Sequence, residues 1–386
     1  MDRRQFFATA GVTLGSLGIL STQGLLAQPA AQPSQTRWLV RTSEALDAIA
    51  FLGALSGGEL YLKRYEREAD FGSLLPQAVR ADLVALRKEA DSGGFGLLWP
   101  GLATILSGAP ATKLSELVAA VAQPEATIRR AYESSSYWDE ADWRWFSAAA
   151  PRLRNILAAM QQAGFAAFRA KLVGNTLDAR AAELQRALST FDVIQWQRKL
   201  TGRDFDPAIE IILLYFSEPH GVRVQGQRFL QSTAYGLATT LRIAAHEMLH
   251  PPIDMKGRVA QAAMATLGQD ELMARIVRDH DPRWGYTTLE GYLNEDLCQA
   301  LDQLISEALG FARNPADRWR KSDDGMHVLA AGLYGLLRQD KWVDTGGTIE
   351  VWLDRANSLG RLRRSSLHPV AARVLERPVD KLWPLA

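Results

Sequence analysis

Apolar residues spaced three and four positions apart dominate the first half of the chain, and this spacing predicts α-helices. The pattern runs from about residue 36 to residue 199, with clusters of Gly, Pro and Ser between the apolar segments. Its clearest helical segments are residues 45–55, 75–90, 114–121, 151–168 and 177–188. Because such clusters punctuate secondary structure, we expect an α-helical N-terminal region over residues 36–200.

The hydrophobic period changes after residue 200. Residues 209–216 form an apolar run that ends in the turn-like residues 217–220, and residues 222–229 alternate apolar and polar side chains. Both segments predict β-strands. Residues 229–250 return to helical spacing, and Pro251 and Pro252 predict the end of that helix at His250. An edge strand beside this helix could pair with an extended peptide.

A second long helical segment covers residues 289–309, and Gly310 is a typical C-terminal stop. The chain after it is again helical, with an interruption near residues 344–347. Together these patterns predict an α+β fold that is predominantly α-helical, with a small β-sheet next to the helix that ends at His250.

The predicted helix ending at His250 carries the motif H-E-x-x-H, formed by His246, Glu247 and His250. Two histidines four residues apart on a helix project from one face and can bind one zinc ion. The glutamate between them can accept a proton from a water molecule that the metal activates. The alternative is a buried helix whose histidines serve only packing and hydrogen bonding.

This motif resembles that of the zincin metallopeptidases. A metzincin would place Gly and a third His after the motif, whereas His250 is followed by Pro-Pro-Ile-Asp-Met-Lys. The gluzincin branch uses a glutamate on a later helix, commonly preceded by asparagine, and Leu293-Asn294-Glu295 resembles that stretch. The resemblance covers roughly residues 209–310 and implies a zincin-like region over residues 201–386, with His246, His250 and Glu295 as zinc ligands.

Three other carboxylates remain alternatives for the third ligand: Glu290, Asp254 and Glu307. The chain also departs from thermolysin-like enzymes four residues after Glu295, where those enzymes carry an aspartate that orients a histidine. Here that position is Gln299. A neutral amide could accept the imidazole N–H, but it would raise the basicity of the ligand less than a carboxylate does.

The resemblance implies a zinc-dependent peptide hydrolase with Glu247 as general base and a peptide or protein as substrate. Such enzymes usually add a tyrosine or histidine that stabilises the oxyanion. The downstream candidates are His280, Tyr286, His327, Tyr334 and His368. Two other functions stay open: a catalytically silent zincin-like protein that binds a peptide or partner, and an exported helical binding protein in which H-E-x-x-H is accidental.

The N-terminus has the pattern of an export signal. Arg3 and Arg4 are followed by two phenylalanines and a moderately apolar stretch, which resembles a twin-arginine signal peptide over residues 1–27. Residues 28–35 would form a loose leader. We therefore expect a periplasmic or secreted protein, without a stable membrane span once the signal is cleaved.

Composition excludes some classes of function. The 386 residues carry a formal net charge of +1, and 23% of them are charged, so no electrostatic footprint of a nucleic-acid-binding protein is present. Cys298 is the single cysteine, so no intramolecular disulfide can form; we expect it to be a small buried residue. The aromatic residues between positions 137 and 146 predict packing between helices, or alternatively a ligand platform.

Overall fold

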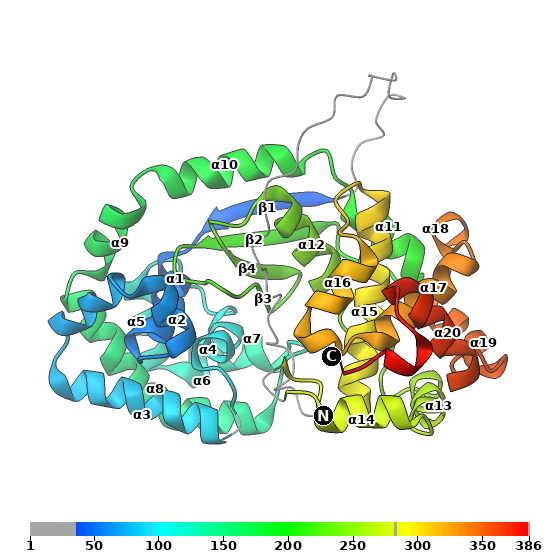
Figure 1. The fold of residues 1–386 in the computed structure, drawn as a ribbon. Helices are drawn as coiled ribbons and strands as arrows, with labels where there is room; N and C mark the ends of the chain where they lie inside the picture. Colours follow the sequence, from blue (N-terminus) through cyan, green and yellow to red (C-terminus); the bar gives the residue numbers. More distant parts are fainter. Residues whose placement is uncertain (1–35, 94, 282–283, 385–386) are drawn as a thin grey trace.

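The computed structural model describes residues 36–93, 95–281 and 284–384. In this part of the chain helices predominate and surround one small mixed sheet (Figure 1). This is the α+β class that the sequence predicts. The predicted signal peptide and leader lie outside the described residues, so export stays a prediction.

The sheet has four strands within the described residues: β1 (Arg37–Thr42), β2 (Ala208–Leu214), β3 (Val222–Val224) and β4 (Arg228–Ser232). Their order is β1-β2-β4-β3. β1, β2 and β4 are parallel, whereas β3 pairs antiparallel with β4. β3 is therefore an edge strand, next to the strand that leads into the helix with the histidine motif.

The structure corrects the predicted strands. β1 lies in a region expected to be helical, because its pairing partner β2 is about 170 residues away and a six-residue alternation is too short to stand out. The predicted strand at residues 222–229 is a hairpin of β3 and β4. Gly226, with a φ of 78°, adopts the left-handed backbone conformation at the turn between them.

The helix with the histidine motif is also shorter than predicted. It is α12 (Leu237–Glu247), and the residues from Phe229 onward pair with β2 instead of opening a helix. A short buried strand and a buried helix segment have the same apolar composition, so spacing alone does not distinguish them. At the other end the helix stops at Glu247, and His250 lies just beyond it.

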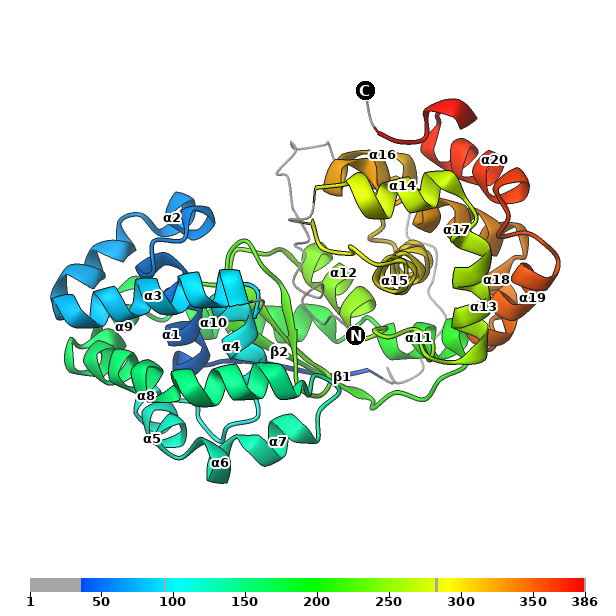
Figure 2. The ribbon, with the colours of Figure 1, turned by 90° about the horizontal axis from the view of Figure 1, so that it is seen from below.

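One group of helices packs on one face of the sheet and forms the lobe on the left of Figure 2, called the first lobe below. It contributes a hydrophobic cluster with the side chains of Ile212, Leu214 and Leu230 from the sheet. These helices are α1 (Glu44–Leu55), α2 (Glu59–Tyr65), α3 (Gln77–Gly93), α4 (Leu98–Leu106), α5 (Leu114–Ala122), α6 (Pro124–Thr127), α7 (Arg129–Glu133), α8 (Glu140–Gln162) and α9 (Phe165–Val173).

The remaining helices pack with the opposite face of the sheet, where Ile209, Ile211 and Phe229 join a second hydrophobic cluster. Most of them form the lobe on the right of Figure 2, called the second lobe below. They are α10 (Thr176–Leu188), α11 (Val193–Thr201), α12, α13 (Arg258–Leu267), α14 (Glu271–Asp279), α15 (Leu289–Ala308), α16 (Pro315–Lys321), α17 (Val328–Gln339), α18 (Trp342–Thr345), α19 (Ile349–Ser358) and α20 (Arg364–Leu375).

Several predicted helices are confirmed, namely α1, α3, α5, α10 and α15, each within a few residues. The helix expected to begin at Pro151 instead begins at Glu140, where Asp139 accepts hydrogen bonds from two backbone N–H groups of the first turn. Pro151 lies inside this helix. The predicted segment at residues 151–168 therefore covers the end of α8 and the start of α9.

α15 occupies the centre of the second lobe and places the candidate site. Thr288 caps its N-terminus, and its side chains from Tyr292 to Ser306 are all buried. α12 packs directly against it. Among the described residues, no single helix has both the length and the apolar character of a membrane span; only the pair α1 and α2, bent by 110°, meets that test when taken together.

Candidate metal centre

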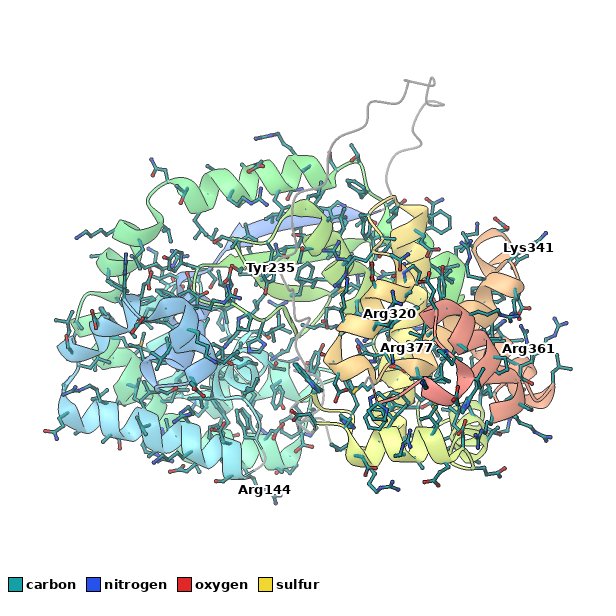
Figure 3. The ribbon with its side chains drawn as sticks, viewed as in Figure 1. Arg144, Tyr235, Arg320, Lys341, Arg361 and Arg377 are labelled. Atoms are coloured by element: carbon teal, nitrogen blue, oxygen red, sulfur yellow. The ribbon has the colours of Figure 1, made fainter. Side chains whose placement is uncertain are left out.

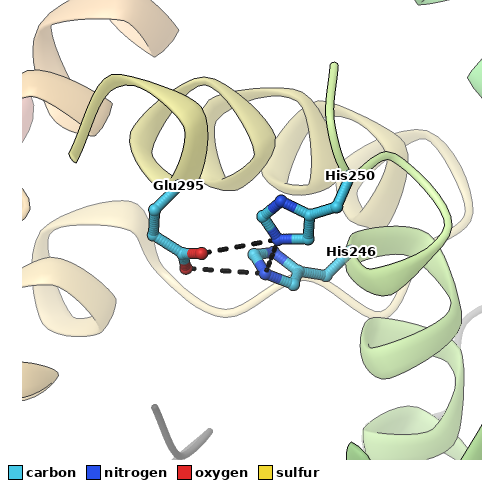
Figure 4. Close-up of side chains that lie close together, drawn as sticks. All are labelled: His246, His250 and Glu295. Carbon is cyan, nitrogen blue, oxygen red and sulfur yellow. Dashed lines mark hydrogen bonds and ion pairs between the residues drawn. The ribbon is translucent and has the colours of Figure 1, made fainter. Parts of the chain in front are cut away.

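Three side chains from two packed helical segments converge at the end of α12 (Figure 4). The Nε2 atoms of His246 and His250 lie 3.0 Å apart. The two carboxylate oxygens of Glu295, in the second turn of α15, lie 3.5 Å from Nε2 of His246 and 3.4 Å from Nε2 of His250. Among the described residues, this is the group of His, Cys, Asp and Glu side chains that could hold a metal ion.

The spacing of these donor atoms fits a tetrahedral zinc site. Bonds of about 2.0–2.1 Å from nitrogen and oxygen place neighbouring ligand atoms roughly 3.3 Å apart. The two nitrogens are 3.0 Å apart, and each lies 3.4–3.5 Å from a different oxygen of the Glu295 carboxylate, so all three separations are close to that value. Two imidazole nitrogens and a carboxylate are also a donor set that catalytic zinc uses, with a fourth position left for water.

Hydrogen bonds on the far side of each ring direct the Nε2 lone pairs toward this point. Nδ1 of His246 lies 2.7 Å from a carboxylate oxygen of Asp302, which can only be an acceptor when ionised. Nδ1 of His250 lies 3.4 Å from Oδ1 of Asn294 and 3.3 Å from Sγ of Cys298. If both Nδ1 atoms carry the proton, two lone pairs and a carboxylate face one another, an arrangement that a cation stabilises.

The electrostatics at this position favour positive charge. Burial opposes protonation of His246, but the carboxylates of Glu295 and Asp302 outweigh it and raise the pKa of the imidazole well above its usual value. Burial likewise works against ionisation of Glu295, yet the two histidines hold the pKa of its carboxyl group well below the usual value. The same field that favours a proton here would favour a metal cation.

Asp302 is held in turn by Arg318 of α16. The guanidinium forms a bidentate ion pair with this carboxylate, with one contact at 2.9 Å. Asp302 did not stand out in the sequence, although it follows Glu295 by seven residues and therefore lies two helical turns further on the same face of α15. That spacing was the available signal.

Gln299, at the position where thermolysin-like enzymes carry an aspartate, forms no hydrogen bond with His246 or His250 within the described residues. Its Nε2 donates to Glu295 at 2.9 Å, and its Oε1 accepts from the indole of Trp319 at 2.8 Å. Gln299 therefore orients Glu295. The role expected at this position, orientation of a histidine, belongs to Asp302 instead.

Glu247 is the last residue of α12 and is half-buried beside the two histidines. Burial raises the pKa of its carboxyl group, and the electrostatic effect of the two histidines acts in the opposite direction. A raised pKa makes this carboxylate a stronger base, which is the property that proton abstraction needs.

Two arginines bind the backbone at the end of α12, where helix carbonyl groups lack partners within the helix. Nη1 of Arg223, on the edge strand β3, donates to the carbonyl oxygens of Glu247 at 2.6 Å and His250 at 2.5 Å. Nη1 of Arg203 donates to Leu249 at 3.1 Å. A guanidinium at this end is also favoured by the helix dipole. Neither arginine stood out in the sequence.

Tyr286 is the one oxyanion candidate that the described structure places against the metal centre. Its side chain is buried, and the carboxylate of Glu295 is close enough to act on its phenol group. Its φ of 59° lies in the left-handed region, which is unusual for a bulky residue and occurs preferentially at functional sites. Burial and the nearby carboxylate of Glu295 raise the pKa of its phenol well above 10.

The other four oxyanion candidates have structural partners elsewhere. Nδ1 of His280 forms a hydrogen bond with the backbone carbonyl oxygen of Ile276, and the hydroxyl of Tyr334 donates to the carboxylate of Glu307. His368 lies 2.6 Å from Asp270. His327 is buried between Asp296 and Asp323, at 2.6 and 2.9 Å, and reaches the site only through Gln299.

The alternative third ligands do not join the two histidines. Glu290 lies in the first turn of α15, Asp254 is exposed in the loop before α13, and Glu307 is bound to Tyr334 and Arg338 at the far end of α15. The prediction for Cys298 is confirmed, because its side chain is fully buried. Trp143 and Phe146 are buried between helices, as the packing prediction requires.

Comparison with known proteins adds no relative: no protein-family model, no curated protein and no solved structure matches the chain.

Proposed function

We propose that the protein is a zinc-dependent peptide hydrolase of the zincin type, with His246, His250 and Glu295 as metal ligands. The observation that carries this proposal is the convergence of two imidazole Nε2 atoms and one carboxylate, with separations of 3.0 to 3.5 Å between the facing atoms. It is supported by the outer contacts, since ligand histidines in zinc enzymes commonly donate their second N–H to a carboxylate, as His246 does to Asp302.

Glu247 is the proposed general base. A bound zinc ion would supply the polarisation that makes water a nucleophile near neutral pH, and a Lewis acid for the scissile carbonyl group. The carboxylate of Glu247 accepts the proton of the attacking water and passes it to the leaving amine. Arg223 keeps this glutamate in place by binding its backbone carbonyl oxygen.

Tyr286 is the proposed donor to the oxyanion that develops during attack on the carbonyl. Its hydroxyl lies beside Glu295 and its burial keeps it protonated. A buried, pre-positioned donor stabilises developing charge more strongly than one in water. The strained backbone of Tyr286 is consistent with a side chain that is held for this purpose.

The edge strand β3 offers a place for an extended substrate. It pairs with β4 on one side only and also packs against α4. A peptide would add to its other edge through main-chain hydrogen bonds. Arg223 is the central residue of this strand and connects it directly to Glu247 and His250. A peptide bound along β3 would therefore lie next to the proposed metal ligands.

Elemental analysis of the purified chain, with the variants His246→Ala, Glu295→Gln and Glu290→Gln, tests the metal site. We expect about one zinc ion per chain in the wild type and in Glu290→Gln, and loss of zinc in the other two variants. Glu290→Gln is the matched control because it changes a carboxylate on the same helix. Zinc that persists in Glu295→Gln would exclude Glu295 as a ligand.

A peptide-library digest with Glu247→Gln as the inactive control then tests the reaction. Cleavage by the wild type that is lost in Glu247→Gln, at equal zinc content, is the expected result. Zinc binding without cleavage of any peptide would favour the silent, partner-binding alternative. A wild type that takes up no zinc even after reconstitution would overturn the proposal and favour a metal-free helical protein.

A further inference from the structure

A hollow of about 440 Å³ lies between α18, α19 and the turn that follows α19. The residues that line it follow the proposed metal ligands by more than 40 positions in the sequence. Two tryptophans and two arginines line it: Trp342, Trp352, Arg355 and Arg361. Figure 3 shows Lys341 and Arg361 at this end of the molecule, beyond the central helix α15. The volume is typical of a small-molecule site, which usually measures about 300–1,000 Å³.

The two indoles form an angled apolar wall. Their ring centroids lie 6.3 Å apart at 48°. Each ring is anchored by its polar end, because Nε1 of Trp342 donates to the carbonyl oxygen of Leu200 at 2.9 Å and Nε1 of Trp352 donates to Asp340 at 2.7 Å. With the N–H groups engaged, the remaining ring surface of Trp342, which is partly exposed, can offer only apolar and π contacts.

Lys341 helps to place Trp342. Its φ of 53° lies in the left-handed region, where a side chain other than Gly is uncommon. This residue joins α17 to α18 and turns the chain so that Trp342 borders a second hollow as well, of about 360 Å³, together with Arg338 and Lys341. A strained residue next to a cavity wall is consistent with a binding role.

The charge on the wall of the hollow is positive. Arg361 forms an ion pair with Asp340, with Nη1 and Oδ2 2.5 Å apart, so these two residues together contribute little net charge. Arg355 is exposed. In the described part of the chain its guanidinium forms no direct ion pair, and its charge acts from a distance on Asp340, whose carboxylate is bound to Arg361. An unpaired guanidinium beside an aromatic wall matches a carboxylate attached to a ring, because arginine binds carboxylates with two parallel hydrogen bonds.

We propose that this hollow binds a small ring compound that carries a carboxylate, with the ring against Trp342 and the acid group on Arg355. Leu359 extends the apolar wall and is 64% exposed, which a bound ring would partly cover. Either an acidic sugar or an aromatic acid has this chemistry. The site shares no residue with the metal centre, so it does not depend on the proposed peptidase function.

The test titrates the full chain with glucuronate and with benzoate, each beside a neutral counterpart, glucose or benzyl alcohol, and follows binding by saturation-transfer NMR. We expect at least one acid to bind about tenfold more tightly than its counterpart. The acid that binds more tightly identifies the source, sugar or aromatic. Equal binding of acids and neutral compounds, or binding of none of them, would overturn the proposal.

Variants at exposed residues test the site without disturbing the folded core. Arg355→Gln should lower the affinity for the acid about tenfold, whereas Arg355→Lys should retain most of the preference. Leu359→Asp should weaken binding through charge repulsion. Arg373→Gln, an exposed arginine in the last turn of α20, is the matched control and should bind as the wild type does. Equal affinities in Arg355→Gln and the wild type would contradict the assignment.

Discussion

Nδ1 of His246 lies 2.7 Å from a carboxylate oxygen of Asp302, a residue 56 positions further along the chain. This contact fixes the orientation of the ring and leaves Nε2 free to face Glu295. Arg318 holds the same carboxylate in a bidentate ion pair. A chain of three residues from α12, α15 and α16 therefore determines where one proposed metal ligand points.

Replacement of Asp302 by Asn should weaken zinc binding about 10- to 100-fold, because a neutral amide raises the basicity of His246 less than a carboxylate does. A competition titration against a chromophoric chelator measures this affinity. Asp354→Asn is the control, since Asp354 pairs with Arg258 at the surface. An affinity equal to that of the wild type would show that Asp302 has only a structural role.

Tyr286→Phe should reduce kcat about 100- to 1,000-fold while the zinc content stays unchanged, because it removes one donor to the developing oxyanion. Steady-state kinetics on a peptide found in the library digest, with elemental analysis of the same samples, separates the two effects. Tyr334→Phe serves as control, because that hydroxyl is bound to Glu307. Unchanged kcat in Tyr286→Phe would place the oxyanion donor elsewhere.

Arg223→Gln should lower the free energy of unfolding by about 1–3 kcal/mol, because two partly buried carbonyl oxygens at the end of α12 lose a charged donor. Urea denaturation followed by circular dichroism measures this change. The control Arg152→Gln removes an exposed ion pair with Glu89 and should cost less than about 1 kcal/mol. Equal effects of the two substitutions would argue against a special role for Arg223.

His220 should make stability depend on pH. It is buried, its Nε2 lies 3.0 Å from the hydroxyl oxygen of Tyr61, and burial lowers its pKa to about 4. Because the unfolded chain binds this proton near pH 6.5 and the folded chain only near pH 4, the stabilising contribution is complete above about pH 6.5 and is lost as the pH falls.

The shift of His220 corresponds to about 3 kcal/mol between pH 7 and pH 4. Urea denaturation of the wild type and of His220→Gln at both pH values should show the wild type losing about that much more stability than the variant. The comparison cancels the titration of carboxylates that both chains share. Parallel losses in the two chains would mean that the pKa of His220 is not lowered in the folded protein.

Much of the helical content follows from local spacing. α1, α5, α10 and α15 lie where the three- and four-residue periodicity predicts them, and Gly310 ends α15 with a φ of 79° as expected. The sheet was less predictable. β1 and β4 exist because each pairs with β2, and pairing energy between distant segments leaves no local trace in a short apolar run.

The sequence by itself determined the parts of this protein that depend on neighbours along the chain. These are the helices with regular apolar spacing and the presence of two histidines and a glutamate at a spacing that suits a metal. The tertiary structure decided the rest of the site. The packing of α12 against α15 brings Glu295 to the histidines and selects Asp302 instead of Gln299 to orient His246. The fold also brings Tyr286, from the segment before α15, close to Glu295. These relationships depend on the distance and rotation between packed helices, which side chains from many parts of the chain determine jointly.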